Sequence, residues 1–197
     1  MFKSAVITVS ILGAMVFVPS THPAQADEAS ATQGKTPAVR CAAEVETASQ
    51  TGTVTAQATH ACQQAVGWAH FVHDELGPAL SNRGVLHLIR DEYQEAIMDF
   101  NAALREGADP VSVLNNRGLA QAGLHRYEAA NASYSAALVK ATSHQERIYF
   151  NRAMAQEDLG NLKAAFLDYR KAAELAPDWR KAADAVARFK VAYPSMV

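Results

Sequence analysis

Asn82-Arg83-Gly84, Asn116-Arg117-Gly118 and Asn151-Arg152-Ala153 are three copies of one triplet, and they decide the fold. The copies begin 34 and 35 residues apart. Self-similarity of this period is typical of solenoids, in which each repeat is a supersecondary unit that buries its apolar face only against its neighbours. The spacing therefore predicts an all-α array of helical hairpins over residues 78–179.

A wider pattern of large and small residues surrounds each triplet. Two antiparallel helices that cross closely need a residue with little or no side chain at the crossing, and an aromatic residue then fills the space between one hairpin and the next. The five packing positions of the three units are occupied by Leu80, Gly84, Ala96, Phe100 and Ala103, then Leu114, Gly118, Ala130, Tyr134 and Ala137, then Tyr149, Ala153, Ala165, Tyr169 and Ala172.

On these residues the chain resembles the tetratricopeptide repeat family, in its exported bacterial form. The resemblance implies a right-handed superhelix of three hairpins at about residues 78–110, 111–143 and 145–178, with Pro177 where the family commonly ends its second helix. The chain departs from the family pattern at two repeated positions, which hold His87, Gln121 and Gln156 in one case and Arg83, Arg117 and Arg152 in the other. Because all three units share these polar residues, we interpret them as a subtype, and we expect the arginines to bond between neighbouring hairpins.

The N-terminus has the features of an export signal. Lys3 precedes an uncharged, mainly apolar run from Ala5 to Val18, and Ala24-Gln25-Ala26 is a small-x-small cleavage motif. We predict a signal peptide over residues 1–26 that is cleaved after Ala26, and a periplasmic or secreted protein. An uncleaved anchor is the alternative, but it needs about 20 apolar residues, and the run here is shorter.

Three further segments flank the signal and the repeats. Residues 27–40 have almost nothing apolar to bury and are expected to be disordered. Residues 41–77 are expected to form an N-terminal helical extension, with Gly52 separating two helices and with Trp68 and Leu76 on one helical face. Residues 180–197 are expected to form a capping helix and tail, with Asp178 as the N-cap, since a terminal repeat otherwise exposes an apolar face.

Cys41 and Cys62 are the two cysteines of the chain. In an oxidising compartment such a pair favours a disulfide, and closing this loop would stabilise the fold by about 3 kcal/mol on the chain-entropy model. Two separate thiols remain the alternative, because a sequence does not give the distance between the two Cα atoms.

The family resemblance also implies a binding surface, the concave groove lined by the first helix of each hairpin. An apolar groove with one cation suits a peptide segment that carries spaced apolar anchors and a carboxylate. The alternative is a groove covered by the segment from Trp68 to Leu76. The residues expected to line the groove are Ser81, Val85, Leu88, Ile89, Asn115, Asn116, Leu119, Ala122, Arg147, Phe150 and Met154.

Catalytic motifs are missing from the sequence, which contains no nucleophile elbow, P-loop or dinucleotide fingerprint. His70, His73 and Asp74 are the best local candidates for a metal, but this spacing alone does not close a site. We therefore predict that the protein is not an enzyme and has neither cofactor nor metal. The formal charge of −2, with acids and bases interspersed, predicts no nucleic-acid partner, and the mature chain is not expected to insert stably into a membrane.

Taken together, these features predict a protein–protein interaction adaptor or scaffold of the cell envelope that binds a peptide segment of a partner in the groove. The alternative is a structural or self-assembling subunit whose groove is occluded and takes no peptide. No residue in the sequence identifies the partner.

Overall fold

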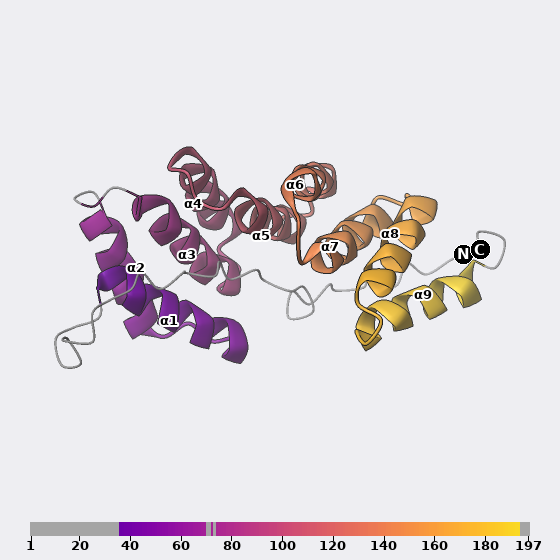
Figure 1. The fold of residues 1–197 in the computed structure, drawn as a ribbon, viewed down its shortest axis with the longest axis horizontal. Helices are drawn as coiled ribbons and strands as arrows, with labels where there is room; N and C mark the ends of the chain where they lie inside the picture. The colour runs from indigo at the N-terminus through magenta and orange to yellow at the C-terminus, as the bar shows by residue number, and fades with distance from the viewer. Residues whose placement is uncertain (1–35, 70–71, 73, 194–197) are drawn as a thin grey trace.

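The computed structural model describes residues 36–69, 72 and 74–193, which form helices and connecting turns without a strand (Figure 1). The predicted all-α array is confirmed. The helices of the described residues are α1 (Pro37–Thr51), α2 (Ala56–Ala69), α3 (Leu76–Ile89), α4 (Tyr93–Arg105), α5 (Pro110–Gly123), α6 (Tyr127–Lys140), α7 (Gln145–Asp158), α8 (Leu162–Leu175) and α9 (Arg180–Ala192).

The helices pair in chain order into antiparallel hairpins that stack along one axis, so that α1 lies near one end of the long axis and α9 near the other (Figure 1). The triplet repeats fall on α3, α5 and α7, the first helices of three successive hairpins. α5 contacts both α3 and α7, and α4 and α6 lie on the opposite side of this row. The first helices therefore form the inner layer of the array.

Each hairpin closes where the sequence predicts the crossing. A Cβ atom placed on Gly84 would lie 2.7 Å from Cε1 of Phe100, and one placed on Gly118 would lie 2.5 Å from Cε1 of Tyr134. Both distances are too short for a real carbon–carbon contact, so the aromatic ring of the second helix occupies the space that a side chain would need. The third hairpin has the slightly larger Ala153 at this position, where it is fully buried.

The turn inside each repeat hairpin has one residue in the left-handed conformation, at the same place in all three hairpins, and the sequence pattern alone does not reveal it. Asp91, His125 and Gly160 stand at equivalent places and have φ values of 60°, 57° and 76°. The left-handed region lets the next amide reach back over the last helical turn, as the N–H of Glu92 does when it donates to the carbonyl of His87 at 2.9 Å. The chain therefore reverses direction over the three residues that connect the two helices of each hairpin.

The N-terminal region differs from the prediction at two points. Helix α1 begins at Pro37, with Thr36 as its N-cap, so the last residues of the segment expected to be disordered are helical. Trp68 and Leu76 belong to separate helices, since α2 ends at Ala69 and α3 begins at Leu76. The expected break at Gly52 is confirmed, because Gly52 caps α1 with a φ of 68°. The predicted signal peptide lies outside the described residues.

Cys41 of α1 and Cys62 of α2 form a disulfide, and both side chains are fully buried. The bond joins the two helices of the first hairpin near the middle of the core that this hairpin shares with α3. The predicted pairing is confirmed.

Helix α9 closes the other end of the array. Phe189 contacts Phe166 and Tyr169 of α8, with ring centroids 6.1 and 5.5 Å apart. Arg188 donates two hydrogen bonds to Glu157 of α7, at 2.6 and 2.7 Å. The helix begins at Arg180 with Trp179 at its N-cap position, so the predicted cap at Asp178 is displaced by one residue.

Candidate peptide-binding surface

The residues predicted to line the groove all lie on α3, α5 and α7, but the structure divides them by burial. Seven of them are buried between helices, namely Ser81, Val85, Leu88, Asn115, Asn116, Leu119 and Phe150. The other four, Ile89, Ala122, Arg147 and Met154, are half-buried. A ligand on this face can therefore touch the four half-buried residues, whereas the seven buried ones support the surface from beneath.

Helix α1 explains much of the burial at the first hairpin. It contacts α3 directly, and Cys41, Val45 and Ala48 of α1 belong to the same apolar cluster as Val85 and Leu88. The N-terminal hairpin therefore covers part of the inner layer. The covering element among the described residues is α1, whereas part of the segment from Trp68 to Leu76, which the sequence had suggested, lies outside the described residues.

Phe150 is covered from the opposite end. Its ring lies 4.8 Å from the ring of Trp179 and 5.2 Å from that of Tyr169, measured between centroids. The ammonium of Lys181 stands 5.2 Å from the same ring, which is a cation–π distance. Partial desolvation of this ammonium against the aromatic ring lowers the pKa of Lys181, although the residue as a whole is exposed. Phe150 is thus a core residue of the C-terminal cap, with 4 % of its surface exposed.

Between the two covered ends, the half-buried residues of α5 and α7 keep access to solvent. Ala122 and Met154 contribute apolar surface there. Arg147, in the first turn of α7, forms no hydrogen bond or ion pair with another described residue. A free guanidinium beside apolar side chains suits a ligand that has both a carboxylate and apolar groups.

A chain of buried amides runs beneath this region. Asn151 of α7 donates to Oδ1 of Asn115 on α5 at 3.0 Å, and Asn115 donates to Oδ1 of Asn116 at 3.4 Å. The link fixes the register of α7 against α5, because a buried amide that lost its partner would carry an unsatisfied polar group. Asn151, the asparagine of the third triplet, therefore joins its hairpin to the preceding one.

The repeated arginines form a second polar ladder, mainly inside each hairpin. Arg83 of α3 donates two hydrogen bonds to Asp99 of α4, at 2.7 and 2.6 Å, and Arg152 of α7 donates two to Asp168 of α8, at 2.7 and 2.9 Å. The hydrogen bonds to these carboxylates raise the pKa of both arginines. The prediction that the arginines bond between hairpins is wrong for these pairs.

The middle hairpin lacks the carboxylate. Arg117 donates to the Ser133 hydroxyl at 3.2 Å and to Oδ1 of Asn101, on the preceding hairpin, at 2.9 Å. Its pKa is lowered by burial, with no acidic partner to oppose the effect. Arg152 makes a similar backward bond to Ser135 of α6 at 3.1 Å, so the expected contact between hairpins exists as a secondary one.

The polar residues that replace the usual aromatic complete this ladder. His87 lies 3.7 Å from Asp99, Gln121 accepts from Ser133 at 2.7 Å, and Gln156 donates to Asp168 at 3.1 Å. Each hairpin thus has one arginine, one histidine or glutamine four residues later, and one aspartate or serine 16 residues after the arginine. This shared spacing was visible in the sequence and could have revealed the ladder.

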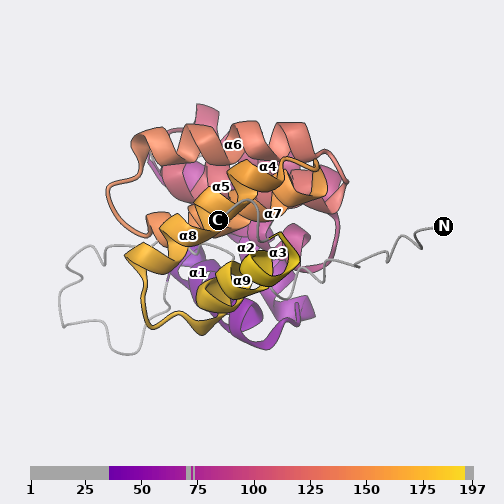
Figure 2. The same cartoon turned by 90° about the vertical axis from the view of Figure 1, so that its right-hand side faces the viewer.

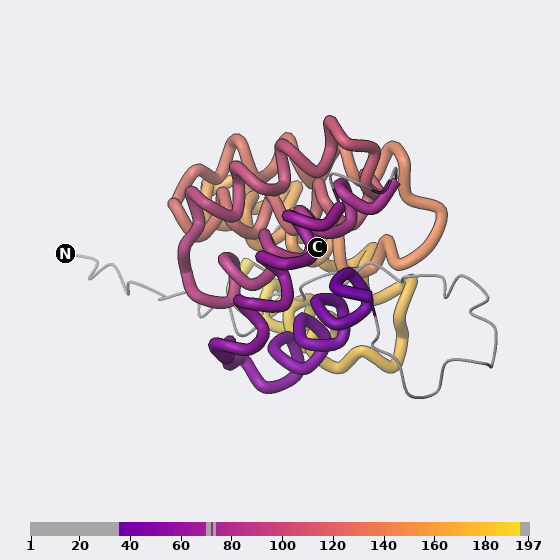
Figure 3. The backbone as a smooth tube through the Cα atoms, turned by 90° about the vertical axis from the view of Figure 1, so that its left-hand side faces the viewer, coloured from indigo at the N-terminus to yellow at the C-terminus, as the bar shows by residue number. Residues whose placement is uncertain are grey.

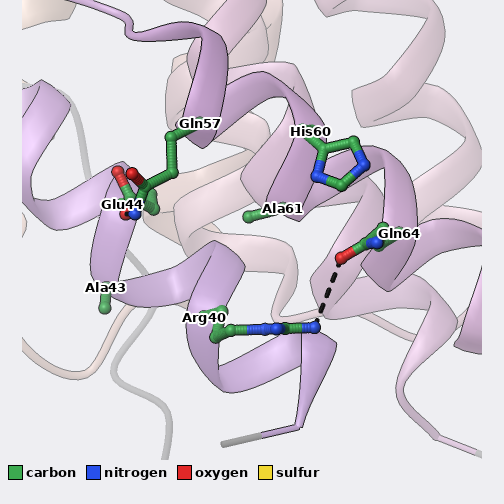
Figure 4. Close-up of a pocket in the computed structure, with 7 residues that line it drawn as sticks. All are labelled: Arg40, Ala43, Glu44, Gln57, His60, Ala61 and Gln64. Atoms are coloured by element: carbon green, nitrogen blue, oxygen red, sulfur yellow. Dashed lines mark hydrogen bonds between the residues drawn. The ribbon is translucent and has the colours of Figure 1, made fainter. Parts of the chain in front are cut away.

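A hollow of about 430 Å³ lies on the first hairpin, away from the predicted groove (Figure 4). Its wall is mostly polar. Arg40 donates to Gln64 at 3.2 Å, and Gln57 donates to Glu44 at 2.7 Å, so its charged groups already have partners. Ala43, His60 and Ala61 complete the lining.

No metal site forms among the described residues, where no group of three or more His, Cys, Asp or Glu side chains could hold an ion. Two of the histidines considered for a metal, His70 and His73, fall outside that part of the chain. Within the same part, no helix combines the length and the apolar character needed to cross a membrane.

Comparison with known proteins identifies one segment. A family model of the tetratricopeptide repeat matches residues 146–178, which cover α7 and α8. No curated protein matches the chain. The matched segment contains Ala153, Ala165, Tyr169 and Ala172, and the hairpins α3–α4 and α5–α6 repeat its crossing geometry.

Proposed function

We propose that the chain, a tetratricopeptide-repeat protein, is an exported adaptor of the cell envelope that binds a peptide segment of a partner on its inner face. The repeats of this family generally serve as non-enzymatic modules for protein interaction. The predicted export signal and the disulfide support a periplasmic or secreted location. The ligand class follows from the surface that α5 and α7 leave accessible.

One observation carries the proposal. Arg147 is half-buried and unpaired among the described residues, and it lies on the same helix as the half-buried Met154. A half-buried cation without a carboxylate loses hydration and gains nothing in return, so an anionic group on a ligand would be favourable there. Met154 and Ala122 then offer adaptable apolar contact to neighbouring side chains of the same peptide.

The test must spare the core. Leu119 and Phe150 are 3 % and 4 % exposed, so a charge at either position would unfold the protein and not report on binding. We therefore choose Arg147→Glu with Met154→Glu. The matched control is Lys163→Glu with Leu167→Glu on α8, which makes the same changes at exposed positions.

The measurement is crosslinking of the exported protein in cells, followed by affinity capture and mass spectrometry. We expect partners that are captured by the wild type and by the α8 control and are lost from the Arg147, Met154 variant. Identical partner profiles for all three proteins would contradict the proposal.

A second candidate function is supported by the position of α1. Because α1 covers part of α3, the array is partly self-occupied, as expected of a structural subunit that assembles through other faces. Under this reading the capture experiment would return only copies of the chain itself.

A further inference from the structure

Helix α9 is the first helix of a fourth hairpin whose second helix is missing from the described residues. α5, α7 and α9 each begin five residues after the preceding helix ends. Ala182, Ala185 and Phe189 are the buried residues of α9. The residues 34 positions earlier on α7 are Ile148, Asn151 and Ala155, which are also buried.

Helix α7 packs against neighbouring helices on two sides, and the comparison shows which of these contacts α9 does not make within the described residues. Ile148 and Ala155 pack into the cluster shared with the preceding hairpins, whereas Ala153 packs into the cluster shared with its own second helix, α8. The position 34 residues after Ala153 is Ala187, and it is exposed. The side of α9 that would receive a second helix is therefore exposed at Ala187, and α9 lies at the front of the end view in Figure 2.

This uncovered side of α9 has an apolar centre and a basic rim. Ala183, Ala187 and Val191 stand four residues apart and are exposed, and Val191 has 84 % of its surface accessible. Arg180 and Lys190 flank them and are exposed as well, and Arg180 lies 3.9 Å from the exposed carboxylate of Asp184. We call this set the α9 face.

The opposite end of the array also presents an exposed helix pair (Figure 3). Helix α1 has Val39, 50 % exposed, one turn from the exposed Ala43, and the 430 Å³ hollow lies between α1 and α2. Glu44 lines the hollow, and the exposed Glu46 follows on the same helix. We call this set the α1 face.

The two ends carry opposite charge. Residues 36–75 contain four carboxylates and one arginine, whereas residues 179–193 contain four cations and one carboxylate. Arg188 pairs with Glu157 and Arg180 with Asp184, and the four cations of α9 still outnumber these two carboxylates. Two α9 faces would repel each other, and so would two α1 faces, so a symmetric contact of either kind is disfavoured.

We propose that the protein associates head to tail with a second copy of itself, with the α9 face of one copy seated on the α1 face of the next. Val191 and the alanines of α9 cover Val39 and Ala43, and the basic rim meets Glu44 and Glu46. The contact supplies α9 with a packing partner that the described residues do not provide. It uses the ends of the array and leaves the inner face free, so it is independent of the peptide-binding proposal.

The test uses one variant for each face. Lys190→Glu with Val191→Asp places acidic groups on the α9 face. Val39→Lys with Glu46→Lys places basic groups on the α1 face. All four positions are exposed, so neither variant disturbs the core. The control, Lys140→Glu with Val139→Asp on α6, makes the same pair of changes, and Val139 is 87 % exposed.

Sedimentation equilibrium of the purified protein at low salt should show a mass that rises with concentration for the wild type and the control. Each face variant should associate at least about tenfold more weakly, and about 0.5 M salt should weaken the wild type as well, because it screens exposed charges. A wild type that stays monomeric, or face variants that associate as the control does, would overturn the proposal.

Mixing the two face variants provides a second, sharper result. Each variant retains one intact face, so an equimolar mixture should form a one-to-one dimer and stop there, because both remaining ends are blocked. A mixture that stays monomeric, while the wild type associates, would rule out the head-to-tail arrangement.

Discussion

Changing Ser133 to aspartate should stabilise the protein, because the middle hairpin has the arginine of the polar ladder without its carboxylate. In the first and third hairpins the equivalent aspartates accept two hydrogen bonds from the arginine at 2.6–2.9 Å while remaining at most 7 % exposed. Ser133 is 2 % exposed and accepts one bond from Arg117, at 3.2 Å. The arrangement around an aspartate at this place already exists twice in the same molecule.

The magnitude follows from the balance of two terms. A bidentate ion pair replaces the single hydrogen bond from Arg117 to Ser133, and hydrogen bonds to charged groups contribute about 1.5–3 kcal/mol each. The bond that the Ser133 hydroxyl donates to Gln121 is lost, and the Gln121 amide must turn to donate to the new carboxylate, as Gln156 donates to Asp168. Desolvation of the new carboxylate opposes this gain, although Arg117 is already half-buried and desolvated. We expect a net increase in the free energy of unfolding of about 1 kcal/mol, which for a chain of this size raises Tm by roughly 2–4 °C.

The assay is urea unfolding followed by circular dichroism, with Ala132→Asp as the matched control. Ala132 is the exposed neighbour of Ser133 on α6, so its change adds the same charge outside the ladder and should cost at most about 0.5 kcal/mol. The reciprocal change, Asp168→Ser, removes two bonds from Arg152 and one from Gln156 and should cost about 2–3 kcal/mol. If Ser133→Asp is no more stable than Ala132→Asp, the reasoning about the ladder is refuted.

Three further predictions concern the hairpin crossings, alkaline pH and the disulfide. Gly118→Ala should lower the free energy of unfolding by about 1–3 kcal/mol, because its Cβ would meet the Tyr134 ring. Gly67→Ala has open space at its Cβ and should raise the free energy of unfolding by up to about 1 kcal/mol. Urea unfolding of the two variants checks both signs. Burial raises the pKa of the Tyr134 phenol, so the phenol ionises first in the unfolded chain and the folded state loses stability as the pH rises above about 10. Tyr134→Phe should reduce this loss of unfolding free energy by up to about 1.4 kcal/mol per pH unit in alkaline unfolding curves. An unchanged slope would contradict the assignment. Replacing both Cys41 and Cys62 by alanine should lower the free energy of unfolding by about 3 kcal/mol, and a variant as stable as the wild type would show that the crosslink contributes nothing.

Much of the fold was predictable because its determinants repeat. The glycine or alanine of each triplet and the aromatic residue 16 positions later define the crossing of each hairpin, and the structure places them in contact. The inner face was less predictable. Helix α1 packs with Val85 and Leu88 in one core cluster, and Trp179 lies against Phe150. Both elements come from distant parts of the chain, and they decide whether these residues line an open groove or belong to the core.

The repeat period, the pairing of helices and the positions of closest approach can all be read from the sequence, because they depend on contacts between residues 12 to 16 positions apart within one repeat. Three features became visible in the three-dimensional packing alone: which part of the inner face stays accessible, which partner each ladder arginine takes, and that no described helix covers the outer side of α9. These features depend on how the terminal elements pack on the array, and no local periodicity encodes that packing.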